Sequence, residues 1–133
     1  MSFIRAAVTD GALTRYARAG DYSMSNPAVT TIAVDANDTL TAAKIAGGIV
    51  LYTGFTATRT LTTDTAANIL AANTAMDIGD SLMFKVSITP AFAGTFAAGT
   101  GVTLVGRTAA TAAAATDVCI TKTSATTVSW IAL

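Results

Sequence analysis

β-Branched side chains are the strongest constraint on the fold of this chain. Threonine, valine and isoleucine together supply 43 of its 133 residues, and threonine alone supplies 25. These side chains lose rotamer freedom in a helix and pack well on a pleated sheet. Alanine is also abundant, with 29 residues, but it is interleaved with threonine and glycine rather than with charged residues. The composition therefore predicts a mainly β protein with a core of small side chains.

The C-terminal part of the chain carries the clearest strand pattern. Residues 81–89 alternate apolar and polar side chains, which is typical of a strand with one buried and one solvated face. Trp130 falls in phase with Val128 and is expected in the core or at a subunit contact. Gly99-Thr100-Gly101 predicts a hairpin loop between two strands. The expected strands cover residues 29–34, 49–53, 57–62, 81–89, 95–98, 102–105, 118–123 and 127–132.

Short strands at this spacing predict an antiparallel β-sandwich or a jelly-roll-like barrel. Residues 107–116, rich in alanine and threonine, are expected to form a loop or an edge segment. The length of the chain favours one domain. We expect residues 39–133 to form the β-sandwich domain and residues 1–38 to form an extended N-terminal arm with short strands.

Two short helices are expected ahead of the strand-rich part. The first runs to Ala46 from a cap at residues 38–39 and stops at Gly47-Gly48, and the second runs to Asn73 from a cap at residues 63–64. Both contain the pattern T-A-A-x-I. An internal duplication would explain this pattern, and so would the shared composition of two capped helices. We favour the second explanation because the flanking residues do not repeat.

The arm contains the candidate partner-binding residues. Its first 20 residues hold three of the five arginines and have a local charge of +2 after subtraction of Asp10. This excess fits ordinary solvated charge or a tethering arm for an acidic patch on a protein, and it fits a nucleic-acid-binding arm less well. The candidate residues are Phe3, Arg5, Arg15, Tyr16, Arg18 and Tyr22.

Charge and residue types exclude several classes of function. Lys plus Arg and Asp plus Glu each count 8, so the formal net charge is zero and no basic excess attracts nucleic acid. The chain has no histidine and no glutamate, so it lacks the usual general base and the commonest metal ligand. No apolar run reaches the roughly 18 residues needed to span a bilayer. Residues 1–20 lack a basic stretch followed by a long apolar run, so we expect no secretory signal. We therefore expect no enzyme activity, no cofactor or metal, and no nucleic-acid or membrane partner.

Several local patterns have a plainer structural explanation. Residues 35–38 and 77–80 bring carboxylates together as a cation site requires, but turn and capping roles explain them. Residues 41–44 and 122–124 match the motifs of serine acyl-enzymes only in part. Cys119, the only cysteine, has no histidine to activate it and is expected to be a small apolar filler.

The segment from about residue 41 to 104 carries TAAKIAGGIV, TRTLTTDTAANILAA, IGDSLMFKVSIT and AGTFAAGTGVTLVG in this order. With these four stretches in this order, the segment resembles virion structural proteins of tailed bacteriophages, and most of all the small head decoration, or cement, proteins. The resemblance implies a β-rich homodimer or homotrimer that binds the major capsid protein on the outside of an assembled head. Such a protein stabilises the head by mass action, because it binds only the assembled state. It would be made in the host cytoplasm and would end on the capsid surface of the virion.

Three other functions are weighed on the sequence alone. A fibre, tail or baseplate module fits the same setting, although such chains run longer and carry repeats or coiled coils. A carbohydrate-binding β-sandwich needs exposed aromatic platforms, for which Tyr16, Tyr22 and Tyr52 are the candidates. An enzyme is the least favoured, for the reasons of composition given above.

Overall fold

The computed structural model describes the backbone of residues 6–10, 13–17 and 27–133, and the side chains of residues 27–133. The structure is mainly β with two short helices, as predicted. In chain order the elements are β1 (Ala6–Asp10), β2 (Leu13–Ala17), β3 (Ala28–Ile32), β4 (Asp38–Leu40), α1 (Ala42–Gly47), β5 (Gly48–Tyr52), β6 (Arg59–Thr63), α2 (Ala66–Ala72), β7 (Ser81–Ile88), β8 (Gly94–Ala97), β9 (Val102–Gly106), β10 (Ala109–Ala110), β11 (Ala114–Lys122) and β12 (Val128–Ala132).

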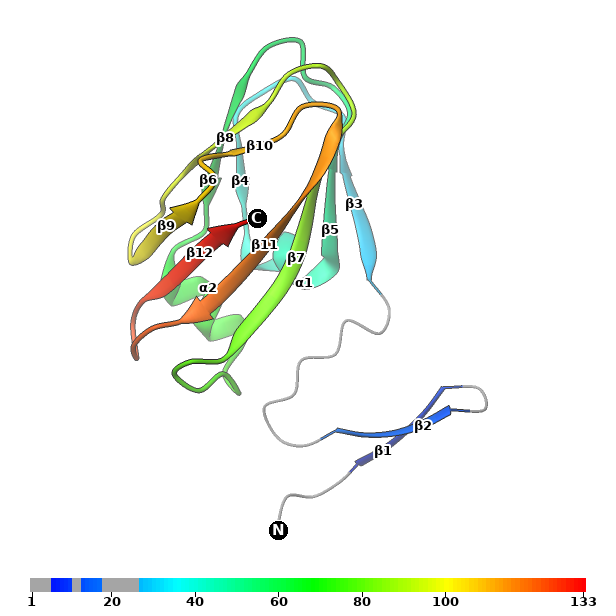
Figure 1. Ribbon diagram of the computed structural model, residues 1–133, viewed down its shortest axis with the longest axis vertical. Coiled ribbons are helices and arrows are strands. Elements are labelled where there is room, and N and C mark those ends of the chain that lie inside the picture. The colour runs from blue at the N-terminus through cyan, green and yellow to red at the C-terminus, as the bar shows by residue number, and fades with distance from the viewer. Residues whose placement is uncertain (1–5, 11–12, 18–26) are drawn as a thin grey trace.

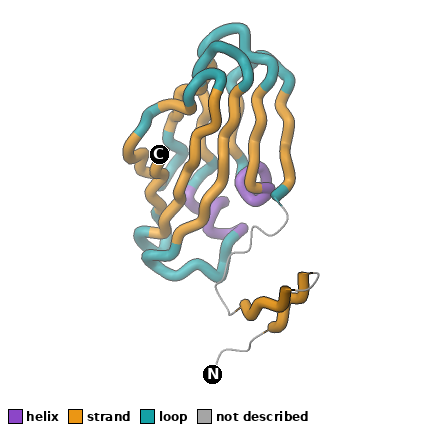
Figure 2. Tube along the Cα trace, turned by 45° about the vertical axis from the view of Figure 1, so that its right-hand side comes forward, coloured by secondary structure: helices purple, strands orange, loops and turns teal. Residues whose placement is uncertain are grey.

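Two sheets enclose the core (Figure 1). The larger sheet has six strands in the order β3-β5-β7-β11-β12-β9, and the smaller has four in the order β10-β8-β6-β4. The two helices lie together at one end of the sheets, and long loops close the other end (Figure 2). Among the described strands, β1 and β2 pair only with each other, as an antiparallel ladder.

Both large sheets are mixed, so the prediction of an antiparallel arrangement is wrong. Five strand pairs are parallel: β3 with β5, β5 with β7, β4 with β6, β6 with β8, and β9 with β12. The cause is the path of the chain. It leaves the larger sheet at β3, enters the smaller sheet at β4 and returns through α1 to β5, so β5 starts at the same end as β3. The chain then repeats this path through β6 and α2 to β7. Each such circuit through both sheets is one turn of the chain.

The two T-A-A-x-I segments occupy equivalent places on these successive turns. Thr41 is the N-cap of α1 and Thr65 is the N-cap of α2, and each side chain accepts a hydrogen bond from the backbone N–H three residues later. The isoleucines of the two segments, Ile45 and Ile69, are both buried. The caps lie later than predicted because the strands β4 and β6 extend up to them. The shared pattern therefore has a shared structural role, which the flanking sequence does not reveal.

Glycine ends the first helix, as predicted. Gly48 caps α1 with φ 93°, a left-handed conformation that costs glycine little, and its N–H donates to the carbonyl of Ile45. The strands β8 and β9, in contrast, do not form the predicted hairpin around Gly99-Thr100-Gly101. They belong to different sheets, and the glycine-containing segment carries the chain from one sheet to the other.

Trp130 lies at the centre of the core, as its phase with Val128 predicts. Its side chain is fully buried and packs edge-on against Phe84 of the larger sheet and Phe96 of the smaller one, with ring centroids 5.1 Å and 5.6 Å away. Edge-to-face contacts of this kind are favourable beyond the area that they bury. One indole thus joins the two sheets.

The strand β3, which the sequence analysis placed in the N-terminal arm, is an edge strand of the larger sheet. Ala28–Ile32 pair in parallel with Gly48–Tyr52. These residues therefore share their sheet with residues from the 39–133 segment, and the predicted division at residue 38 does not follow the sheet.

Gly99 offers a test of how closely successive turns approach each other. A Cβ atom at this position would lie 2.5 Å from the carbonyl oxygen of Asp64 and 2.6 Å from that of Thr63. Because backbone atoms cannot move aside easily, we expect Gly99→Ala to lower the free energy of unfolding by about 1–3 kcal/mol in urea titrations. Thr100→Ala is the control, since Thr100 is the exposed neighbour of Gly99 and substitutions at exposed sites usually change stability by less than about 0.5 kcal/mol. Equal unfolding midpoints for the two variants would contradict the close approach.

Candidate functional site

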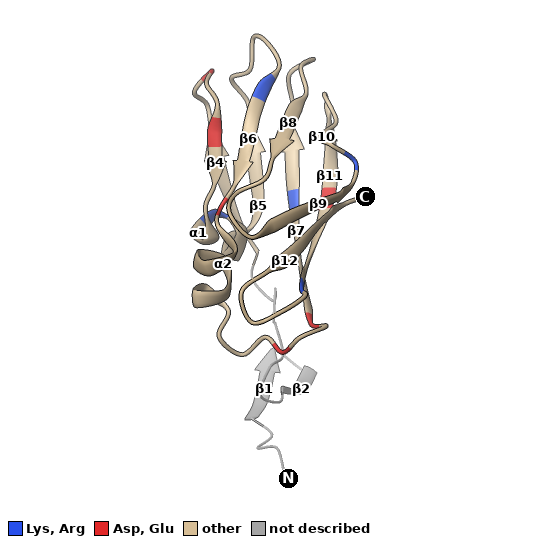
Figure 3. Ribbon diagram, turned by 90° about the vertical axis from the view of Figure 1, so that its left-hand side faces the viewer, with Lys and Arg blue, Asp and Glu red and all other residues tan. Residues whose placement is uncertain are grey.

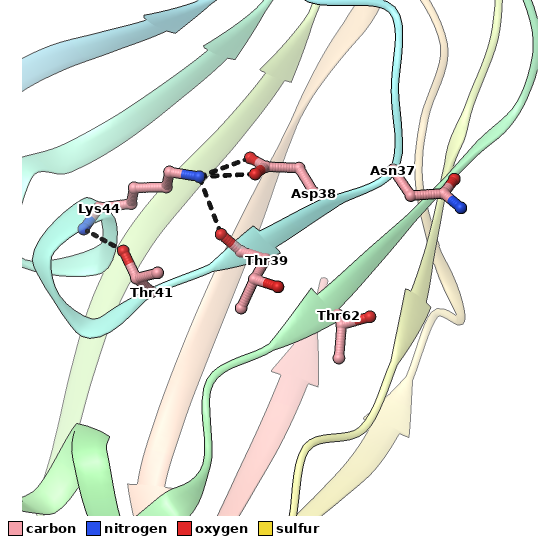
Figure 4. Close-up of a pocket in the computed structure, with 6 residues that line it drawn as sticks. All are labelled: Asn37, Asp38, Thr39, Thr41, Lys44 and Thr62. Carbon is pink, nitrogen blue, oxygen red and sulfur yellow. Dashed lines mark hydrogen bonds and ion pairs between the residues drawn. The ribbon is translucent and has the colours of Figure 1, made fainter.

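A polar pocket of about 320 Å³ lies between β4 and α1 (Figure 4). Two strands of the smaller sheet and the start of α1 contribute its walls, and all its side chains are polar. The Lys44 and Asp38 side chains point toward each other, while Thr62 comes from the neighbouring strand β6. The lining residues are Asn37, Asp38, Thr39, Thr41, Lys44 and Thr62.

An internal ion pair occupies one side of this pocket. Lys44 Nζ donates to both carboxylate oxygens of Asp38 at 2.7 Å and to the carbonyl oxygen of Thr39 at 2.9 Å. The hydroxyl of Tyr52, whose side chain is fully buried, donates to Asp38 Oδ2 at 2.7 Å. Asp38 therefore ties together three elements, namely β4, α1 and β5.

The pKa values of this group follow from its surroundings. Partial burial acts to raise the pKa of Asp38, but hydrogen bonds from Lys44 and Tyr52 outweigh it and hold the pKa below the ordinary value of 3.8. Burial and the hydrogen bond to Asp38 raise the pKa of Tyr52 far above its ordinary range. At neutral pH the aspartate is charged and the phenol is neutral. The arrangement is that of a structural clamp.

A second ion pair joins the loop after β3 to the next turn of the chain. Arg59 donates to both oxygens of Asp35 at 2.8 Å, and Thr56 donates through its backbone N–H at 3.0 Å and through its hydroxyl. The hydrogen bonds from Arg59 and Thr56 hold the pKa of Asp35 well below its usual range. The Arg59 side chain is half-buried in this contact.

Two further side chains satisfy backbone groups of a neighbouring turn. Asn37 accepts a hydrogen bond from the N–H of Thr60 at 2.9 Å, and Asp64 accepts one from the N–H of Ala42 at 2.8 Å. Asp80 accepts from the N–H of Asp77 at 2.9 Å, which confirms the predicted turn role of that pair. Within residues 27–133, whose side chains are described, no three His, Cys, Asp or Glu side chains lie together as a metal site requires.

The six predicted partner-binding residues lie outside the part of the chain whose side chains are described. Arg15 and Tyr16 belong to β2, where their backbones pair with Val8 and Ala7. The other four, Phe3, Arg5, Arg18 and Tyr22, fall outside the described residues altogether. Their role in binding stays a prediction. Tyr52, named as a candidate sugar platform, is buried and offers no exposed ring.

The outer face of the larger sheet is the surface that sequence analysis missed. Charged residues are sparse on the body of the protein (Figure 3). On the strands of this sheet, Lys85 and Asp117 are the only charged side chains that point outward among the described residues, and Lys85 Nζ lies 3.5 Å from Asp117 Oδ1. Cys119, which the sequence analysis interpreted as a small apolar filler, also lies on this face and is half-buried.

The register of the paired strands brings the apolar side chains of this outer face together. The alternation in residues 81–89 predicted that Met83 and Lys85 face solvent, and they do. Met83 is aligned with Cys119 on β11, and Cys119 is aligned with Ile131 on β12. No local pattern in the sequence indicates which strands pair or in what register, so the row of apolar side chains appears only in the fold.

Asp38→Asn tests the clamp between β4, α1 and β5. The substitution removes the charge that two donors require, and we expect the free energy of unfolding to fall by about 1–3 kcal/mol. Asp77→Asn is the matched control, because Asp77 is exposed and only its backbone forms hydrogen bonds within residues 27–133, and substitutions at such sites usually change stability by less than about 0.5 kcal/mol. Chemical denaturation of both variants measures the difference. An equal effect of the two substitutions would argue against the clamp.

Acid should destabilise the protein through the same carboxylates. The pKa values of Asp35, Asp38 and Asp64 are all lower in the folded state than the ordinary value of 3.8. The unfolded chain therefore takes up protons first as the pH falls, so the stability present above about pH 4 is lost progressively below it. With no histidine in the chain, we expect little change in stability between about pH 5 and 6.5. Melting temperatures measured from about pH 2 to pH 6.5 check both the loss of stability in acid and the plateau above it. A melting temperature unchanged between pH 5 and pH 2 would contradict the expectation.

None of the described helices is long and apolar enough to cross a membrane. What the chain does must be inferred from its own surfaces, because comparisons with protein-family models, curated proteins and solved structures found no match.

Proposed function

We propose that this chain is a structural virion protein, a decoration or cement protein that binds the major capsid protein on the outside of an assembled tailed-phage head. One observation carries the proposal: the outward faces of both large sheets are broad and almost without charge. The larger sheet presents one lysine and one aspartate, which pair with each other. Surfaces of this kind can pack against neighbouring subunits without the cost of desolvating many charges.

The outer face of the smaller sheet supports the same function. Along its strands, outward residues alternate with buried ones such as Leu61 and Phe96. These outward residues are all threonine or alanine, which have small side chains. The strand registers place them in two short rows across the sheet. These residues are Thr39, Thr60, Thr62, Thr95, Ala97 and Ala109.

In this proposal the two packed sheets are the body of a β-sandwich, and the chain ahead of β3 is the arm that bridges adjacent capsid subunits. The arm would contribute the aromatic and arginine contacts named above. The protein acts in many copies as a homo-oligomer. Each copy stabilises the head because it binds the assembled lattice and not free capsid subunits.

Binding to isolated phage parts tests this function. We expect the purified full-length chain to sediment with undecorated heads and not with purified tails or fibres. Deletion of residues 1–25 should weaken head binding by about tenfold or more, because a second linked contact is lost, while the β signal in circular dichroism stays intact.

Other outcomes would overturn parts of the proposal. Binding to tails or fibres in place of heads would favour a fibre or baseplate module. Unchanged head binding by the deletion variant would remove the arm from the account. A full-length chain that binds neither part would contradict the virion function itself.

A further inference from the structure

A row of exposed and half-buried apolar side chains crosses the outer face of the larger sheet. Met83, Cys119, Ile131 and Val105 are register partners on four neighbouring strands, β7, β11, β12 and β9. Met83 is 43% exposed and Val105 is 45% exposed. Exposed apolar side chains scattered singly are ordinary, but a continuous row marks a contact surface.

A second row runs beside the first and contains the only outward charges on the described strands of this sheet. Val29, Ile49, Lys85 and Asp117 are aligned in register across β3, β5, β7 and β11. Leu133, which is 60% exposed, continues this row because its N–H donates to the carbonyl of Asp117. The row thus has apolar side chains on both flanks and one lysine beside one aspartate near its middle.

This pattern complements itself about one particular axis. In a face-to-face pair of sheets, a two-fold axis that runs parallel to the strands between β7 and β11 exchanges the places of these two strands. Lys85 then faces Asp117 of the second copy, and Ile49 faces Leu133 of the second copy. An axis perpendicular to the strands would instead place Lys85 opposite Lys85, and like charges in contact are unfavourable.

We infer that the outer face of the larger sheet is the contact between two copies of this chain, packed face to face about a two-fold axis along β7 and β11. The inference rests on the proposed function for the expectation of a homo-oligomer, and on the strand registers for the surface. We infer a second copy as the partner of this face because the face carries both a lysine and an aspartate. Two such faces can therefore form two Lys85–Asp117 pairs with each other.

Complementary charge variants test this contact. Lys85→Asp makes the central charges of the face all negative, and Asp117→Lys makes them all positive. By light scattering after size exclusion, we expect the wild type to be a dimer and each variant alone to dissociate at least roughly tenfold more readily. An equal mixture of the two variants should form a dimer again, because the carboxylates of one variant then face the ammonium groups of the other. A fold defect in either variant would not produce this rescue.

Further measurements separate the surface from nonspecific association. Met83→Lys should also weaken the dimer, whereas Phe92→Lys, at an exposed apolar residue in the loop after β7, should not. Labelling of Cys119 by a maleimide should slow as protein concentration rises. A monomer at all concentrations, a trimer, or a mixture of charge variants that fails to associate would overturn the inference.

The outcomes also distinguish this inference from the proposed function. A charge-rescued dimer that does not bind heads leaves the two-fold contact standing and removes the capsid role. A chain that binds heads but is a monomer both in solution and on them leaves the capsid role and removes the two-fold contact.

Discussion

The parallel stacking of successive chain turns is the constraint on which the rest of the structure depends. Each turn visits both sheets and returns to its starting end, so a slip of one residue between turns would expose the core side of a strand. Side chains prevent such a slip. Asp35, Asn37 and Asp64 each accept a hydrogen bond from a backbone N–H of a neighbouring turn, and the Asp38 clamp joins β4 to β5. Most charged side chains of residues 27–133 lie at strand ends, in turns or on α1, and none of them is buried.

Because most charged side chains lie at strand ends and in turns, few of them reach the outer faces of the two sheets. The strands β11 and β12 add to β7 in antiparallel order, and Trp130 on β12 contacts aromatic rings of both sheets. The added strands widen the larger sheet without bringing charge to its outer face apart from Asp117, which pairs with Lys85. A wide and nearly uncharged face is the consequence, and it is the basis of both proposals.

Local features of the fold could be predicted from the sequence, and the pairing of distant segments could not. Alternation indicated β7 and the burial of Trp130, and glycine indicated the end of α1. Gly99-Thr100-Gly101 suggested a hairpin because a glycine-containing loop of three residues is a local signal. The close neighbours of Gly99 are the carbonyls of Thr63 and Asp64, far earlier in the chain, and no pattern in the sequence records that contact. The outward row at Met83 escaped prediction for the same reason.

The direction of the strands links the two proposals. The first residue of β3, Ala28, is aligned with Gly48, the residue that directly follows α1. The chain therefore enters the two-sheet body at the end where the helices lie (Figure 1). A two-fold axis parallel to the strands keeps both copies pointing the same way. Both helix ends, and both points where the preceding chain enters, then lie on one side of the dimer. If both proposals hold, such a dimer would meet the capsid with its axis normal to the shell, because this orientation brings both entry points of the preceding chain to the same surface.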